Sequence, residues 1–229
     1  YSYTDNAKWY GPTLSDNTPY LIHAVHNTSA TFHELYINET TQSPSDYTTS
    51  VVTDGSLYLG ASRNMSNTLG GDIAEFIIYK QKLNTAQKII VENFLAAKYG
   101  ISIATDRYAF EATHRYDVAG IGQVDAGNLH TEAQSAATIS IGNPTGLNDG
   151  EFVLFGHDNG DMGSWTSIER PNNDPNIMRI AREWVVDLTG DPGILTITLN
   201  DSLLPAQLPG FTNYTLWTDT DGNFSSGAI

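Results

Sequence analysis

Residues 70–102 read GGDIAEFIIYKQKLNTAQKIIVENFLAAKYGIS and hold the strongest structural signal in the chain. After the glycine pair, the apolar run over residues 73–79 is typical of a strand that is buried on at least one face. The residues from Thr85 to Tyr99 contain neither Gly nor Pro, and their apolar positions recur at helical spacing. The stretch therefore predicts a strand, a short connection and a single helix.

The ends of this helix are marked by capping residues. Asn84 stands three residues before Gln87, which is the spacing of a capping box at a helix N-terminus. Lys98 lies in the last turn, where a cation complements the helix dipole, and Gly100 is suited to the left-handed residue that ends a helix. A helix of this length is marginal by itself, so it must pack against another part of the protein.

The rest of the chain reads as β-structure. Short apolar or alternating runs are separated by turns rich in Gly, Asn, Asp and Pro, which is the pattern of β-sandwiches. Before the helix these runs cover residues 20–25, 35–38 and 56–60; after it they cover residues 118–122, 138–142, 152–157, 180–188, 194–199 and 214–217. The sequence thus predicts an all-β protein with one helix and a second β-sandwich after it.

The stretch from Gly71 to Tyr79, followed by Lys98-Tyr99-Gly100-Ile101, resembles the end of a concanavalin A-like domain of the laminin-G type. The branch concerned is common in large secreted bacterial proteins, and the resemblance covers about residues 18–103. One departure is Glu39, which replaces the Gly of an Asn-Gly pair in that family. The resemblance implies that residues 1–103, with the helix at 85–99, form the C-terminal part of a jelly roll.

Residues 104–229 resemble an uncharacterised β-domain that often follows the laminin-G-type domain in large surface proteins of the Bacteroidetes. The matching marks are an A-G-I-G turn at 119–122, a G-H-D-N-G loop at 156–160 and an R-x-W strand at 182–184. No activity follows from this resemblance. It implies a second β-sandwich, truncated at its C-terminus, within a longer multidomain protein. Such proteins commonly leave the cell by type IX secretion and serve in attachment or gliding.

Composition narrows the range of partners. The 229 residues are 40% hydrophobic, contain no Cys, and carry 26 acidic against 11 basic residues for a net charge of −15. The absence of Cys excludes disulfides, thiolate metal sites and Cys nucleophiles. Scattered basic residues argue against nucleic acid as a partner, and no apolar run approaches the ~20 residues of a membrane span. We expect a soluble extracellular or cell-surface domain that is not inserted in a membrane.

Asp72 and Glu75 suggest the E-x-D-x-x-E motif of concanavalin-like glucanases, but the match fails. Gly70 occupies the position of the nucleophilic Glu. Residues three apart on a regular strand also point to opposite faces, whereas glycosidase carboxylates must flank one bond about 5–10 Å apart. We interpret Asp72 and Glu75 as structural residues and predict no catalytic residue in this chain.

The histidines do not form a zinc-binding pattern. No H-E-x-x-H occurs, and His33-Glu34 lacks a second His at helical spacing. His23 and His26 are three apart in a predicted strand, which places them on opposite faces. His157 lies in the G-H-D-N-G loop and is interpreted as a residue that organises the turn. The remaining histidines are His114 and His130.

Calcium is the better candidate metal, because hard cations bind clustered oxygen ligands on loops. Two clusters qualify: Asp158, Asn159 and Asp161, and Asp219, Asp221 and Asn223. The second lacks the Gly and Glu of an EF-hand loop. Two interpretations stay open for it: one weak calcium site, or a hairpin turn capped by its own Asp and Asn side chains.

Aromatic residues beside turns could stack on the C–H faces of sugars, or they could belong to the core. They are Trp9, Tyr10, Tyr47, Trp165 and Trp217. Together with the resemblance, they favour non-catalytic domains that act in adhesion or in binding an extracellular glycan or other surface ligand. The alternatives are an accessory region of a secreted polysaccharide-degrading enzyme and a passive structural stalk.

Overall fold

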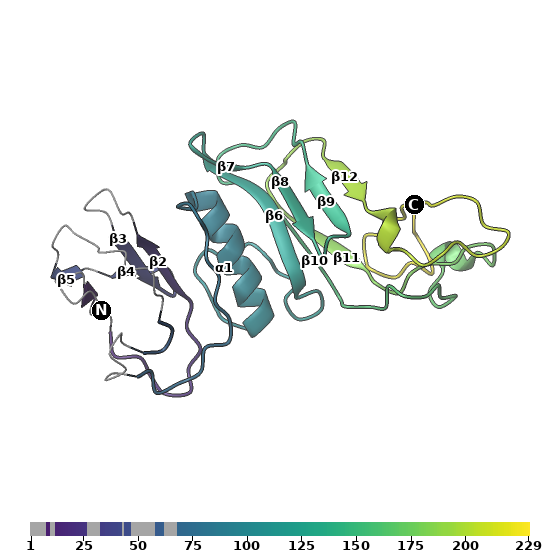
Figure 1. Ribbon diagram of the computed structural model, residues 1–229. Coiled ribbons are helices and arrows are strands. Elements are labelled where there is room, and N and C mark those ends of the chain that lie inside the picture. Colours follow the sequence, from purple (N-terminus) through teal and green to yellow (C-terminus); the bar gives the residue numbers. More distant parts are fainter. Residues whose placement is uncertain (1–7, 10–11, 27–32, 43, 47–57, 62–67) are drawn as a thin grey trace. The chain divides into compact units, whose positions relative to one another are not determined.

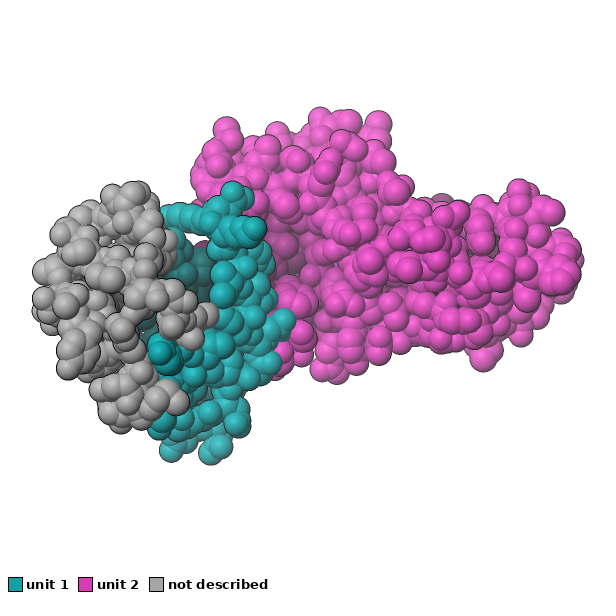
Figure 2. All heavy atoms as spheres, in the orientation of Figure 1, with its two compact units in different colours: residues 1–83, 101–104 teal, residues 84–100, 105–229 magenta. Residues whose placement is uncertain are grey.

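The computed structural model describes residues 8–9, 12–26, 33–42, 44–46, 58–61 and 68–229 (Figure 1). The chain divides into two compact units (Figure 2). The first comprises residues 1–83 and 101–104, and the second comprises residues 84–100 and 105–229. In their described parts, both units contain antiparallel strands, and the second unit also contains one α-helix, so the predicted all-β class is confirmed. None of the described helices has the length and hydropathy needed to cross a membrane.

In the first unit, a three-stranded antiparallel sheet has the order β2-β3-β4. Its strands are β2 Ile22–His26, β3 His33–Ile37 and β4 Thr40–Gln42; a separate two-stranded pair joins β1 Lys8–Trp9 to β5 Pro44–Asp46. The strands predicted at 20–25 and 35–38 are therefore present as β2 and β3. A jelly roll for this unit stays a prediction.

The hairpin between β3 and β4 turns through Asn38 and Glu39. Ile37 pairs with Thr40, so the loop has two residues, and both have positive φ angles, 43° and 65°. Asn tolerates this left-handed conformation, but for Glu it costs on the order of 1 kcal/mol compared with Gly. The Asn38 side chain offsets part of this cost, because its Oδ1 accepts the Leu21 N–H at 2.8 Å.

The apolar run at 73–79 lies in neither a helix nor a strand of the described part of the chain. Ile73 and Phe76 are each 49% exposed, and Ile78 is 66% exposed. An apolar run becomes a strand only where a neighbouring strand receives its backbone hydrogen bonds. The strand predicted here is thus not confirmed. Of the strand predicted at 56–60, residues 56–57 lie outside the described residues, and residues 58–60 belong to neither a strand nor a helix.

The helix α1 spans Thr85–Tyr99, as predicted, and both of its caps are present. The Asn84 side chain accepts the Gln87 N–H at 2.9 Å, and the Gln87 Oε1 accepts the Asn84 N–H at 3.1 Å. Gly100 ends the helix in the left-handed conformation with φ 66°. The first helical N–H, of Thr85, is accepted by the side chain of Asn128 at 2.9 Å, which ties the start of α1 to the second unit.

Two antiparallel sheets form the β-structure of the second unit. The four-stranded sheet has the order β11-β10-β6-β7, and the three-stranded sheet has the order β12-β9-β8. The strands are β6 Tyr116–Asp125, β7 Asn128–His130, β8 Glu132–Ser135, β9 Ile139–Gly142, β10 Phe152–His157, β11 Trp184–Thr189 and β12 Thr196–Leu199. Short 3₁₀ helices lie at η1 Pro171–Asn173 and η2 Asp201–Leu203. The strand predicted at 214–217 is absent.

Strand β10 lies at the centre of the unit, and all six of its residues are buried. Phe152 and Leu154 pack in one core cluster with Ile89 and Ile90 of α1. Val153 and Phe155, which point the other way, pack with β9 in a second cluster. The unit therefore has three layers: α1, the four-stranded sheet and the three-stranded sheet.

Two glycines of β6 leave room for the side chains of β10 that face α1. Gly122 pairs with Phe152 and Gly120 pairs with Leu154. A Cβ on Gly122 would lie 2.1 Å from the Phe152 Cδ1, and one on Gly120 would lie 2.9 Å from the Leu154 Cγ. Large side chains of β10 thus cover glycines of β6 directly. The A-G-I-G segment is the middle of β6. The apolar run predicted at 118–122 is therefore a strand, and the turn that the resemblance implies at 119–122 is wrong.

The position of α1 differs from the expectation that it closes the N-terminal domain. Its buried residues Ala86, Ile89, Ile90 and Ala97 belong to the core cluster of the second unit. The physical reason is complementarity, since β6 and β10 present an apolar face that requires cover. The helix is therefore the outer layer of the second sandwich.

Candidate functional site

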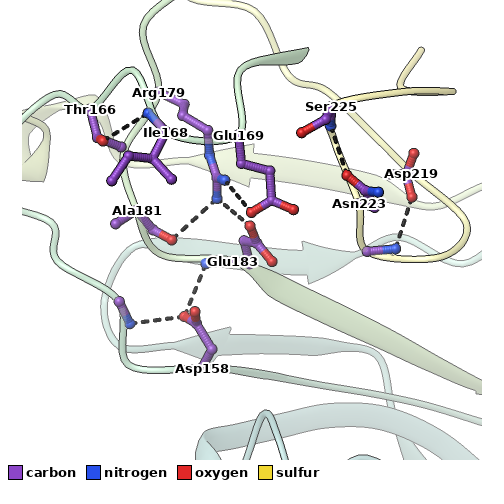
Figure 3. A network of polar contacts seen from close by, with 12 residues as sticks. Asp158, Thr166, Ile168, Glu169, Arg179, Ala181, Glu183, Asp219, Asn223 and Ser225 are labelled. Carbon is purple, nitrogen blue, oxygen red and sulfur yellow. Dashed lines mark hydrogen bonds and ion pairs between the residues drawn. The ribbon is translucent and has the colours of Figure 1, made fainter. Parts of the chain in front are cut away.

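The loop predicted to bind calcium is held together by its own side chains. The Asp219 Oδ1 accepts the backbone N–H groups of Asp221 and Gly222, each at 2.8 Å. The Asp221 Oδ1 accepts the Asn223 N–H at 2.9 Å. The Asn223 Oδ1 accepts the Ser225 N–H at 3.2 Å (Figure 3). The hydrogen bonds that the Asp219 carboxylate accepts, led by that from the Asp221 N–H, lower the pKa of Asp219. The side chains form a series of Asx turns.

The other oxygen-rich loop is built in a similar way. The Asp158 Oδ1 accepts the N–H of Gly160 at 2.9 Å and that of Glu183 at 3.1 Å. Asp161 accepts the Gly163 N–H at 2.8 Å and the Ser164 hydroxyl at 2.6 Å. Within the described residues, no group of three His, Cys, Asp or Glu side chains could hold a metal ion. Calcium at Asp219, Asp221 and Asn223 stays a prediction.

Arg179 is the centre of a polar network that the sequence did not indicate (Figure 3). Its guanidinium pairs with Glu169 at 3.3 Å and with Glu183, and it donates to the Ala181 carbonyl at 3.2 Å. The ring of Phe224 lies 5.4 Å from the guanidinium carbon. Burial raises the pKa of Glu183, and the hydrogen bond and charge of Arg179 act against this rise. The network joins the start of β11 to the loop before it and to the C-terminal loop.

Two asparagines of η1 hold the C-terminal loop in place. The Asn172 N–H donates to the Phe224 carbonyl at 2.8 Å, and its side chain donates to the Ala228 carbonyl at 2.9 Å. The Asn173 side chain donates to the Ser225 carbonyl at 2.8 Å. Both have positive φ angles, 53° and 56°, which Asn tolerates better than most residues. Arg179 and these residues therefore act together as a structural clamp.

His157 is a fully buried ionisable group of the second unit, with 1% of its side chain exposed. Its ring stacks on Tyr116 and meets the edge of Trp184, both with centroids 5.9 Å away. The Nε2 lies 2.9 Å from the Asp117 Oδ2. Asp117 has a φ of 48° within β6, which is an uncommon conformation that turns its carboxylate toward the histidine.

The hydrogen bonds fix the tautomer of His157. The Asn159 N–H donates to the Nδ1 at 3.0 Å, so the Nδ1 carries no proton and the Nε2–H donates to Asp117. Both ring nitrogens are occupied, and neither is available as a base or a metal ligand. His157 organises the turn after β10, as the sequence predicted. Its link to Asp117, 40 residues away, had no signal in the sequence.

We expect His157 to make the second unit sensitive to acid. Burial lowers the pKa of His157, and the hydrogen bond to Asp117 only partly opposes this effect. Below the ordinary pKa of about 6.5, the unfolded chain binds more protons than the folded one, so the free energy of unfolding falls as pH decreases. The loss is complete once the pH lies below the folded pKa. Urea unfolding at a series of pH values measures this slope.

His130 supplies the comparison, because burial also lowers its pKa. A His130→Gln variant removes the contribution of His130 to the pH dependence of the free energy of unfolding. The pH dependence that remains in this variant then includes the contribution of His157. In His157→Gln the slope attributable to His157 should disappear, with a loss of about 1–3 kcal/mol at neutral pH from the disturbed hydrogen bonds. An unchanged slope in His157→Gln would contradict this explanation.

Three carboxylates near the start of the second unit form a further group that sequence reasoning missed. Burial first, and the neighbouring Asp106 and Asp187 next, raise the pKa of Glu111. Asp106 accepts the Tyr108 N–H at 3.0 Å, and Asp187 accepts the Ala109 N–H at 2.7 Å. Two of the three carboxylates therefore fix the backbone of the 105–110 segment.

The predicted aromatic residues are only partly brought together. Trp165 stacks on Tyr214 with centroids 6.1 Å apart and planes inclined by 25°. The Trp165 Nε1–H donates to the Ala206 carbonyl at 2.9 Å. Tyr214 is 46% exposed, so this pair presents aromatic surface to solvent. Trp217 is half-buried. The side chain of Trp9 and the residues Tyr10 and Tyr47 lie outside the described part.

The other predicted residues lie apart. Asp72 is exposed and Glu75 is half-buried in the first unit. His23 stacks on Tyr36 with centroids 5.5 Å apart, and the side chains of His26 and His33 lie outside the described part. The His114 Nδ1 is within 2.9 Å of the Thr113 hydroxyl.

Comparison with known proteins gives one family. No curated protein and no solved structure matches the chain. A family model described as "Domain of unknown function (DUF8202)" matches residues 87–229, which include most of α1 and all strands of the second unit. The chain therefore belongs to the DUF8202 family.

Proposed function

We propose that this chain is a non-catalytic part of a large secreted or cell-surface bacterial protein, and that it binds an extracellular carbohydrate. The observation that carries the proposal is the pair of Trp165 and Tyr214. Aromatic rings with one apolar face and a polar edge suit the C–H faces and hydroxyls of sugars.

The residues around Trp165 and Tyr214 also support carbohydrate binding. The Trp165 indole is held in position by its hydrogen bond to Ala206, so its orientation is set before a ligand arrives. Asp161 and Ser164, which precede it, form a polar turn that can exchange hydrogen bonds with sugar hydroxyls. A jelly roll of the laminin-G type in the first unit is the accompanying structural proposal, and the antiparallel sheet β2-β3-β4 is compatible with it.

The experiment is binding of the purified chain to an array of bacterial and algal polysaccharides, with affinities measured by calorimetry. We expect binding without turnover of the glycan. Tyr214→Ala and Trp165→Ala should each weaken binding by about tenfold or more, by analogy with bases, whose stacking on an aromatic ring contributes on the order of 1–3 kcal/mol.

Tyr79→Ala is the matched control. Tyr79 is 47% exposed, close to the 46% of Tyr214, but it lies in the first unit. This variant should bind as the unchanged chain does. If no glycan binds, or if Tyr79→Ala and Tyr214→Ala weaken binding equally, the pair is not the binding site. A complete absence of ligands would favour a passive stalk.

A further inference from the structure

The loop that carries Trp165 contains a carboxylate whose hydrogen bonds are made within the loop. Asp161 accepts the Ser164 hydroxyl at 2.6 Å and the Gly163 N–H at 2.8 Å. These hydrogen bonds, that from Ser164 first, lower the pKa of Asp161, so its carboxylate is ionised at neutral pH. Because Ser164 directly precedes Trp165, this negative charge lies beside the aromatic pair of Trp165 and Tyr214.

Arg182 is a cation near this carboxylate, and its charge also lowers the pKa of Asp161. The Arg182 Nε donates to the Gly160 carbonyl at 3.0 Å, and its Nη2 lies 3.5 Å from the Asn159 Oδ1. Oxygens of the loop therefore occupy the edge of the guanidinium that these two nitrogens form. A paired contact to a sugar carboxylate or sulfate needs such an edge to be free.

Arg179 lies close to the aromatic pair along the backbone, but its charge is also used. Thr166, which follows Trp165, exchanges two backbone hydrogen bonds with Arg179, at 2.8 and 3.1 Å. The Arg179 guanidinium is paired with both Glu169 and Glu183. A guanidinium between two carboxylates offers no free positive charge to a ligand.

The wider balance of charge is also negative. Residues 158–229 contain ten acidic residues, three Arg and neither Lys nor His. The third Arg is Arg170, which is half-buried and whose Nε has no hydrogen-bond partner among the described residues. Recognition of sulfate or carboxylate groups depends on Arg or Lys. A polyanion would instead bring its charges within the Debye length of several carboxylates, which is about 8–10 Å at physiological ionic strength.

We propose that Trp165 and Tyr214 select uncharged polysaccharides and that this part of the second unit excludes sulfated and uronate-rich ones. The inference rests on the carbohydrate binding proposed above and names the class of glycan. Stacking on aromatic rings and hydrogen bonding of hydroxyls need no charge on the ligand. The groups beside Trp165 supply neither a free cation for an anionic sugar nor a carboxylate without partners for an amino sugar.

The first test uses pairs of polymers that share a backbone and differ in charge. Each uncharged polymer that binds the intact chain, such as hydroxyethylcellulose or dextran, is compared by calorimetry with its anionic counterpart, carboxymethylcellulose or dextran sulfate. We expect the anionic member to bind about tenfold more weakly at low salt, and the difference to shrink at high salt as the repulsion is screened. The affinity for the uncharged member should not depend on salt.

The possible results separate this inference from the function on which it rests. An anionic polymer that binds as tightly as its uncharged counterpart, or more tightly, would overturn the selectivity but leave carbohydrate binding intact. Loss of that binding in Arg170→Gln would then assign it to the one guanidinium that has no carboxylate partner among the described residues. No binding of any polymer would contradict carbohydrate binding itself, and the selectivity with it.

A charge reversal beside the aromatic pair gives the second test. Asp161→Lys should raise the affinity for the anionic polymer relative to its uncharged counterpart by about tenfold, because the local charge changes by two units. Asp72→Lys is the matched control, since Asp72 is exposed and lies in the first unit. It should change this ratio by less than about twofold. Thermal unfolding checks that both variants are folded, and equal changes of the ratio in the two variants would contradict the proposal.

Discussion

Removal of α1 is expected to abolish the folding of the second unit. A chain of residues 84–229 should fold cooperatively, whereas a chain of residues 105–229 should not. In the second chain Val118, Phe152 and Leu154, which are at most 5% exposed in the intact protein, would face water. Thermal unfolding followed by circular dichroism measures the difference.

The size of this effect follows from the core that α1 covers. Ile89 and Ile90 of the helix and the three residues that they cover each contribute roughly 2 kcal/mol by their burial. The total is about 10 kcal/mol, which is comparable to the complete stability of an ordinary domain. Without α1, we therefore do not expect a second unit that is folded but less stable. The chain of residues 105–229 should show no cooperative unfolding transition.

Gly122→Val is expected to destabilise the second unit by about 3 kcal/mol, which lowers the melting temperature by about 6–12 °C. The cause is overpacking, because the new Cβ would lie 2.1–2.8 Å from three ring atoms of Phe152. The ring cannot move freely, since Phe152 is 1% exposed beneath α1. Differential scanning calorimetry of the intact chain measures this shift.

Gly70→Val is the matched control for this substitution, because nothing lies within 4 Å of the position of its Cβ. It should change the melting temperature of the second unit by less than about 2 °C. Adding Phe152→Leu to Gly122→Val should recover part of the lost stability by making room over the strand. Equal effects of Gly122→Val and Gly70→Val would show that β6 and β10 do not pack as described.

The features predicted correctly from the sequence are those with local causes. The bounds of α1 and both caps follow from Asn84, Gln87 and Gly100, whose contacts lie within the helix ends. β10 was recognisable because an apolar run of six residues matches a strand that is buried on both faces. β8 was missed because Glu132–Ser135 contains no apolar alternation that marks it.

The features that were missed depend on contacts between distant residues. The capping residues of α1 do not indicate which sheet the helix covers. Its position depends on Gly120, Gly122 and the side chains of β10, against which it packs. The glycines of β6 fit both the apolar run predicted at 118–122 and the turn that the resemblance implies, because Gly is common in turns. The bond between His157 and Asp117 needs the pairing of β10 with β6, which no local pattern specifies.

The assignment of α1 to the second unit is tested most directly by the melting curves of the two shortened chains. We predict a single cooperative transition with native circular dichroism for residues 84–229, and no transition for residues 105–229. The family match, which begins at residue 87, agrees with this division. A chain of residues 105–229 that melts cooperatively at the same temperature as residues 84–229 would contradict it.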